Sequence, residues 1–250
     1  MSEFLINLFE NWGFTKVPEQ IAYLSDLGGM AFNIWETVYA PALATLFAYA
    51  IGLPLGILLV IGEEGGIRPM PKLLMRILNT VVNLLRSVPF LILMVVVFPL
   101  SRLILGTSVG TAATIVPLTV AAAPYVARIV EISLREMDRG VIETAQAMGC
   151  SPWQIVTKVM LPECRPSLIN GATNAAITIL GYGAMAGAIG GRGLGAVALM
   201  RGYGRGQKLV MYAAVIILVI LVQIIQSIGT AWSVKSDRRI NPTEKKKRRT

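Results

Sequence analysis

Residues 209–234, LVMYAAVIILVILVQIIQSIGTAWSV, form a long apolar stretch without a formal charge. A helix of about 20 apolar residues crosses the roughly 30 Å hydrocarbon core of a bilayer, so this stretch predicts a membrane span. Three other charge-free stretches pass the same test, at 37–62, 103–127 and 166–191. With 54% hydrophobic and only 15% charged residues, the whole chain has the composition of a membrane protein.

A fifth apolar stretch, SVPFLILMVVVFPLS at 87–101, is too short by itself to cross the bilayer. It becomes long enough if the helix begins near Ile77 and Arg86 extends its charged end toward the headgroups. The sequence therefore predicts an all-α integral membrane protein with five transmembrane helices. The expected helices are 37–62, 77–101, 108–130, 166–190 and 209–233.

The basic residues predict how these helices are oriented. An odd number of spans places the two termini on opposite sides, and the side richer in Lys and Arg is usually cytoplasmic. Eight Lys and Arg residues lie from Lys235 onward, five in the loop 128–165 and three between residues 68 and 76. All of them face the cytoplasm if the C-terminus does, and the N-terminus is then extracytoplasmic. Five basic residues oppose this pattern without outweighing it: Arg102, Arg192, Arg201, Arg205 and Lys208.

The two ends of the chain lie outside the five-helix domain, which spans residues 36–233. Residues 1–35 lack the basic start and continuous apolar core of a signal peptide. Phe4, Leu5, Leu8 and Phe9 share one helical face, so this extracytoplasmic extension is either a surface helix or has no fixed structure. Residues 234–250 form a basic cytoplasmic tail that holds most of the net charge of +9.

Several functional classes are disfavoured by composition. The basic residues gather in the tail, without the interleaved aromatic residues of nucleic-acid-binding surfaces. Cys150 and Cys164 have no metal-ligand spacing and the chain has no histidine, so we expect free thiols and no metal or other cofactor. A membrane-embedded enzyme or an ion-coupled transporter would need ionisable groups within its spans, where we find only Arg86 and charges near the ends. These two classes are the less favoured alternatives.

A polar segment at 143–162, ETAQAMGCSPWQIVTKVMLP, interrupts the apolar spans. Ile142, Ala145 and Met148 share one face of a short helix that we expect to begin near Arg139. Gly149 is well placed to end this helix, because glycine adopts the left-handed conformation at little cost.

A second short helix is expected directly afterwards. Ser151, Pro152 and Gln154 have the order of an N-cap, a first-turn proline and a capping-box partner. Leu161-Pro162 is expected to stop this helix before the next span. The loop of about 131–165 therefore predicts a cytoplasmic helix–turn–helix. A simple amphipathic connector resting on lipid would not need so many caps.

This segment resembles the EAA loop of ATP-binding-cassette importer permeases, whose pattern is E-A-A-x-x-x-G, nine residues, and I-x-L-P. The matching residues are Glu143-Thr144-Ala145, Gly149 and Val159-Met160-Leu161-Pro162, in which Thr144 replaces an alanine and Val159 an isoleucine. Three further stretches resemble the methionine-importer permeases: RSVPFLIL at 86–93, GTSVGTAATIVPLTVAAAPYVAR at 106–128 and LGYGAMAGAIGGRGLG at 180–195. The likeness covers about residues 36–233.

The resemblance implies a type I importer in a bacterial inner membrane. In such importers two permease subunits pair as a homodimer, two soluble ATPases dock beneath them, and an extracytoplasmic binding protein delivers the substrate. The chain has no G-x-x-x-x-G-K-[ST] motif, so ATP hydrolysis would fall to the partner ATPase and this subunit would be non-catalytic. The implied cargo is an amino acid, methionine first, with another amino acid or a dipeptide as the alternative. The resemblance identifies no substrate-binding residue.

The resemblance also implies which residues of the loop couple to the ATPase. Glu143 would offer a carboxylate to a basic group in the ATPase groove, and Ala145 and Met148 would make apolar contact. Gly149 would set the angle between the two short helices. The expected coupling residues are Glu143, Ala145, Met148, Gly149, Leu161 and Pro162, of which the last two would join the docked piece to the next span.

Four glycines recur at every fourth residue near the end of the fourth predicted span: Gly183, Gly187, Gly191 and Gly195. In lipid, small residues at this spacing let two helix backbones approach closely. We therefore expect a packing face, either at a dimer axis or within one subunit.

Overall fold

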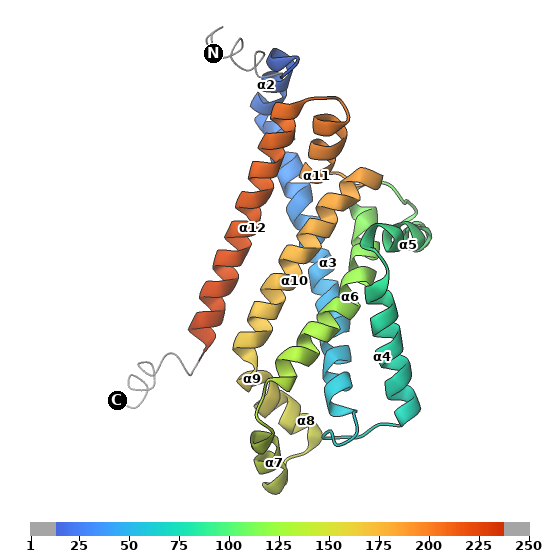
Figure 1. The fold of residues 1–250 in the computed structure, drawn as a ribbon, viewed down its shortest axis with the longest axis vertical. Coiled ribbons are helices and arrows are strands. Elements are labelled where there is room, and N and C mark those ends of the chain that lie inside the picture. Colours follow the sequence, from blue (N-terminus) through green and yellow to red (C-terminus); the bar gives the residue numbers. More distant parts are fainter. Residues whose placement is uncertain (1–13, 238–250) are drawn as a thin grey trace, which may run out of the picture. The chain divides into compact units, whose positions relative to one another are not determined.

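The computed structural model describes residues 14–237, which contain helices and turns but no strand, so the predicted all-α class is confirmed. Four helices of this range are long and apolar enough to cross a membrane (Figure 1). A broken pair, α4 (Lys72–Ser87) and α5 (Phe90–Leu105), counts as a fifth span if its two halves are taken together. The four long helices are α3 (Leu27–Ile61), α6 (Thr111–Arg135), α10 (Arg165–Ala186) and α12 (Lys208–Ser236).

Two of the long helices extend beyond the spans expected from the sequence, because charged residues do not end them. The helix α3 begins ten residues before the expected start at 37, where the Asp26 carboxylate accepts a hydrogen bond from the Gly29 N–H at 3.1 Å. Glu36 then lies buried inside this helix. The helix α6 continues past residue 130 to Arg135, which bonds Glu131 one turn away.

A short helix, α2 (Val17–Ser25), lies in the expected N-terminal extension, and its Val17 and Gln20 are fully buried. The apolar face expected at Phe4–Phe9 and most of the basic tail lie outside the described residues.

The continuous helix expected over 77–101 is broken, which corrects that prediction. Val88 has an extended backbone, with φ −76° and ψ 127°, and separates α4 from Pro89 and α5. The proline ring disfavours the helical conformation in the residue before it, and proline has no N–H to donate to the preceding turn. Apolar content predicts the membrane location here, whereas Pro89 decides where the helix ends.

The helices form two compact units, each built from three separate stretches of chain. The first unit comprises Met1–Ala44, Pro89–Val120 and Thr178–Gln223, and the second comprises Thr45–Val88, Ala121–Ile177 and Ile224–Thr250. Each of the four long helices therefore contributes one part to each unit.

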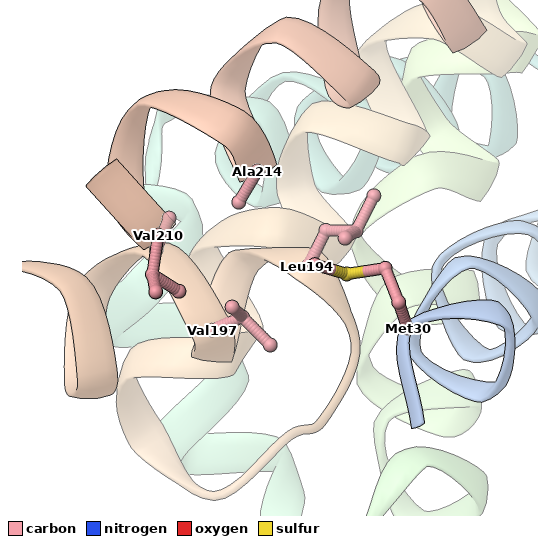
Figure 2. Packing of buried hydrophobic residues seen from close by; sticks show 6 residues of the cluster. Met30, Leu194, Val197, Val210 and Ala214 are labelled. Atoms are coloured by element: carbon pink, nitrogen blue, oxygen red, sulfur yellow. The ribbon is translucent and has the colours of Figure 1, made fainter. Parts of the chain in front are cut away.

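The first unit has a core around α11 (Leu194–Ala196), the π-helix η3 (Val197–Tyr203) and the start of α12. Figure 2 shows its side chains: Met30, Leu194, Val197, Val210 and Ala214, with Ala198 completing the cluster. Two side chains of this unit cap helix starts. The Thr37 hydroxyl accepts the Leu194 N–H at 2.8 Å, and the Gln20 carbonyl accepts the Leu209 N–H at 2.8 Å. Both satisfy N–H groups that have no partner within their own helix.

The second unit brings α3 and α6 into close backbone contact at Gly52 and Gly56. A Cβ atom at Gly52 would lie 2.7 Å from the Ala123 carbonyl oxygen, and one at Gly56 would lie 2.5 Å from the Ala127 carbonyl oxygen. The two glycines lie one turn apart, the spacing that lets helices approach closely in lipid. This pair was not among the packing glycines predicted from the sequence.

The Gly56→Ala substitution should destabilise the second unit by about 1–3 kcal/mol, because the added methyl group meets fixed backbone rather than a flexible side chain. Gly181→Ala is a matched control in α10, where a Cβ atom would meet nothing within 4 Å. The control should be neutral or stabilising by up to about 1 kcal/mol, as expected for glycine in a helix. Thermal unfolding of the two purified variants in detergent would measure the difference. Equal melting temperatures would contradict the close contact of α3 with α6.

Candidate functional site

The connection between α6 and α10 lies within the second unit and contains four short helical elements: α7 (Arg139–Ala147), α8 (Pro152–Gln154), the π-helix η1 (Ile155–Met160) and α9 (Leu161–Glu163) (Figure 1). The Asp138 carboxylate begins α7 by accepting the Gly140 N–H at 2.8 Å. This N-cap agrees with the predicted start near Arg139, although Asp138 itself was not predicted as the cap.

The turn after α7 depends on glycine. Gly149 has φ +78°, the left-handed conformation expected from the sequence. Its N–H donates to the Gln146 carbonyl at 2.9 Å, and the Cys150 N–H donates to the Ala145 carbonyl at 3.1 Å. These two bonds satisfy carbonyl groups that the end of α7 leaves free. The direction in which the chain leaves α7 is therefore set by one residue.

The second short helix begins with the predicted capping box. The Gln154 side chain accepts the Ser151 N–H at 2.8 Å, and the Ser151 hydroxyl accepts the Gln154 N–H at 3.4 Å. Pro152 occupies the first helical position, where its missing N–H is not needed. Both ends of the turn are thus held by local hydrogen bonds.

Leu161-Pro162 does not stop the second helix, which corrects another prediction. The helix runs on as η1 and α9 to Glu163. Pro162 has no N–H for the carbonyl four residues earlier, and its ring would crowd that carbonyl in a regular α-helix. The chain instead widens into a π-helical turn, in which the Leu161 N–H donates to the Val156 carbonyl. The proline is accommodated within the helix.

Two large apolar side chains next to the Gly149 turn are exposed. The side chains of Met148 and Trp153 are 78% and 75% exposed, on opposite sides of the Gly149 turn in the sequence. Glu143 and Pro162 are also exposed, and Leu161 is half-buried. Ala145 is only 7% exposed, so its side chain packs within the chain and offers no apolar contact to a partner, contrary to expectation.

A polar pocket of about 400 Å³ opens between α7 and the end of α3 in the second unit. Its charged lining consists of Glu63, Arg135, Arg139 and Glu143. Glu143 therefore lies at the edge of a pocket that holds both signs of charge.

Next to this pocket is a network of charged side chains centred on Glu131, which is 4% exposed. Its carboxylate lies 2.7 Å from the Arg128 guanidinium and 3.0 Å from that of Arg135. Arg135 also makes two hydrogen bonds to Glu63, at 2.7 and 3.0 Å, and Arg128 donates to the Asn83 side chain at 2.7 Å. The network joins α6 to α4 and to the turn after α3. The sequence feature that could have predicted this network is the i, i+3 and i, i+4 spacing of Arg128, Glu131 and Arg135.

The four glycines of the predicted packing face do not share one helix. The regular helix α10 ends at Ala186, so Gly183 lies in α10, Gly187 in the 3₁₀ turn η2 (Gly187–Ile189), Gly191 after it, and Gly195 in α11. A Cβ atom at Gly187 would lie 2.7 Å from the Gly195 carbonyl carbon. The chain folds back on itself at these two glycines.

Comparison with known proteins relates these features to a family. Residues 52–241 match the family described as binding-protein-dependent transport system inner membrane component. A probable D-methionine transport system permease protein MetI from Vibrio cholerae serotype O1 is 45% identical over 227 residues, or 90% of this chain and 99% of that protein. A protein of the same description from Pasteurella multocida is 44% identical over 204 residues, or 82% of this chain and 94% of that protein.

A solved structure gives the same assignment. One chain of the MetNI methionine ABC transporter in an inward-facing conformation is 45% identical and matches with a TM-score of 0.80, covering 82% of this chain and 94% of that chain. The chain therefore belongs to the family of binding-protein-dependent transport system inner membrane components.

Proposed function

We propose that this chain is the membrane-spanning permease subunit of an ATP-driven importer of methionine. Two copies pair, two ATP-binding-cassette ATPases dock on the α7–α9 connection, and an extracytoplasmic binding protein delivers the amino acid. The chain supplies the path through the membrane, and the partner ATPases hydrolyse ATP. The family membership and the methionine importers among its relatives support this assignment.

The local structure of the α7–α9 connection gives the main support for this function. Two short helices are held at a defined angle by Gly149 and a capping box, and they present the exposed side chains of Met148 and Trp153. Exposed apolar side chains on a rigid element are typical of a protein interface. Glu143 is exposed on α7, where it is available to a basic group of the ATPase. Rotation of the docked ATPases would move this connection as a rigid body and, through η1 and α9, the start of α10.

The proposal includes an orientation, in which the α7–α9 connection and the end of α12 face the cytoplasm. The excess of Lys and Arg on that side supports it. Single cysteines introduced on a Cys-free background at Asp237 and at Lys16 should react with an impermeant thiol reagent from opposite sides of the membrane. Reaction of both from the same side would contradict the orientation.

Reconstitution tests the function directly. Liposomes that contain this chain, its ATPase and the binding protein should accumulate methionine only when ATP is supplied, and the permease alone should not hydrolyse ATP above background. A panel of other amino acids and dipeptides as competitors measures the cargo preference. Uptake driven by an ion gradient without ATP, or hydrolysis by the permease alone, would refute the proposal.

Glu143→Ala should weaken association with the ATPase about tenfold or more, because it removes a charge-assisted contact at the docking surface. Thr144→Ala is the matched control: the Thr144 hydroxyl donates only to the Gly140 carbonyl within α7, at 2.7 Å. The control should bind the ATPase as the wild type does. Titration of labelled ATPase onto the purified permease measures both affinities, and equal affinities for wild type and Glu143→Ala would remove Glu143 from the docking surface.

A further inference from the structure

The first unit contains a buried carboxylate with an unsatisfied oxygen. Glu36, in α3, is 7% exposed, and its Oε2 atom has no hydrogen-bond partner among the described residues. No salt bridge within residues 14–237 includes it either. An ionised carboxylate buried without a partner is costly, and such groups within membrane helices usually serve a function. The described residues therefore leave one oxygen of the Glu36 carboxylate without a partner, and a cationic ligand would compensate the charge of this group.

Arginine side chains lie around the same carboxylate. Glu36 lines a pocket of about 290 Å³, open on one side, whose lining also includes Arg192, Arg201 and Arg205. Glu36 and Arg192 also line a second, much smaller cavity of about 10 Å³. The larger pocket thus carries a carboxylate and guanidinium groups that are not paired with it.

The Arg201 guanidinium and the backbone next to Arg192 are held in place by their surroundings. The Arg201 guanidinium lies 3.9 Å from the centroid of the Tyr23 ring, a distance typical of a cation–π contact. Arg192 precedes Gly193, whose φ of +84° brings the chain against Thr37, and the Thr37 hydroxyl accepts the Leu194 N–H. Thr37 is the residue next to Glu36, so the backbone that carries Arg192 is tied to the helix that carries the carboxylate.

Apart from Asn33 and Tyr23, the rest of the pocket lining is apolar. Phe32 and Met200 are 53% and 58% exposed, and Val197 and Ala196 also line the pocket. A volume of about 290 Å³ is just below the roughly 300–1,000 Å³ of small-molecule sites. The pocket therefore suits a small ligand with an apolar part.

We propose that this pocket binds an apolar α-amino acid as its zwitterion. The ammonium group pairs with the Glu36 carboxylate, Arg192 donates to the carboxylate of the ligand, and the ligand's side chain lies against Phe32 and Met200. A simple cation would leave the arginines without a partner, and a simple anion would leave Glu36 unsatisfied. A zwitterion satisfies both, and carboxylate–guanidinium pairs are among the stronger charge-assisted hydrogen bonds.

The choice of methionine as the ligand rests on the proposed function, and the proposed orientation places this pocket on the extracytoplasmic side. The pocket would then hold the amino acid where it enters the permease. Binding here is separate from ATPase docking, because the α7–α9 connection belongs to the second unit and the pocket to the first.

Equilibrium binding of radiolabelled methionine to the purified permease–ATPase complex, without binding protein, tests the inference. Glu36→Gln, which keeps the shape of the side chain and removes its charge, should weaken methionine binding about tenfold or more. It should leave the weaker binding of N-acetylmethionine, which has no ammonium group, unchanged. Arg192→Met should also weaken methionine binding. It should leave unchanged the binding of methionine methyl ester, which has no free carboxylate. Because every preparation contains the same ATPase, only differences between permease variants report on the pocket.

Glu19→Gln is the control, since Glu19 is an exposed carboxylate in α2 of the same unit and does not line the pocket. Every variant should co-purify with the ATPase at wild-type stoichiometry, so a failure of ATPase docking is distinguished from a failure of the pocket. Equal methionine affinity in wild type, Glu36→Gln and Arg192→Met would overturn the inference. So would a Glu36→Gln variant that binds methionine normally and loses only its affinity for the binding protein, because the pocket would then be a protein contact.

Discussion

Gly149→Val should uncouple the permease from its ATPase while leaving the membrane helices intact. Gly149 has φ +78°, and the left-handed conformation costs a residue with a side chain about 1–2 kcal/mol, more for a β-branched one. A shift of this size changes the population of the native turn by about 5–30-fold. The bonds from Gly149 and Cys150 to the end of α7 would be lost with the turn, and the exposed side chains of Met148 and Trp153 on either side of it would change their relative positions. We expect transport and transport-linked ATP hydrolysis to fall at least tenfold.

The matched control is Gly149→Asn, because asparagine tolerates the left-handed conformation. A Cβ atom at this position would meet nothing within 4 Å, so neither substitution creates a clash inside the chain. Any difference between the two variants therefore reports backbone conformation alone. Co-purification with the ATPase and ATP-driven uptake in liposomes measure the effect. If Gly149→Val binds its ATPase and transports as well as Gly149→Asn does, the α7–α9 connection is only a linker.

Glu131→Gln should destabilise the second unit by about 3 kcal/mol. Removing one member of a buried ion pair usually costs about 3–5 kcal/mol, because the other charge is left unpaired. Here Arg135 keeps its bonds to Glu63, and Arg128 and Arg135 are partly exposed, at 24% and 43%, so we expect the lower value. Thermal or denaturant unfolding of the purified chain, followed by tryptophan fluorescence, measures the change.

The ion pair of Glu64 with Lys72 provides the comparison for Glu131. The two side chains lie 2.7 Å apart but are 71% and 79% exposed. Exposed pairs of this kind contribute little to stability, so Glu64→Gln should unfold like the wild type. If Glu131→Gln also unfolds like the wild type, the network does not stabilise the contact of α6 with α3 and α4.

The membrane spans were predictable because apolar composition alone identifies residues that reside in lipid. Their ends were less predictable, because charges were taken as boundaries. Glu36 and Glu131 are instead buried within helices, where α3 and α6 extend past the expected limits. The break at Val88-Pro89 was missed for a related reason, since hydropathy does not record the loss of one backbone N–H.

The α7–α9 connection was predictable in detail because its structure is local. Gly149 and the Ser151–Gln154 capping box act over three or four residues, and the order of residue types is enough to predict them. The contact of Arg135 with Glu63 joins residues 72 positions apart, and the pairing of Gly56 with Ala127 likewise depends on how helices pack. The sequence pattern also could not predict which side chains are exposed. It placed Ala145 and Met148 on one apolar face, but Ala145 is buried and Met148 is exposed.

The division of the long helices between two units has a consequence for biosynthesis. The first unit needs residues up to Gln223 and the second needs residues from Ile224, so both are completed by the last helix, α12. Earlier helices can enter the bilayer one by one as the ribosome releases them, but the core of the first unit cannot close before α12 arrives, because Val210 and Ala214 belong to it. A nascent chain halted before Lys208 should thus be membrane-integrated yet readily cleaved by protease. During translation, proteases and chaperones would therefore encounter an inserted but incompletely folded protein until α12 has been added.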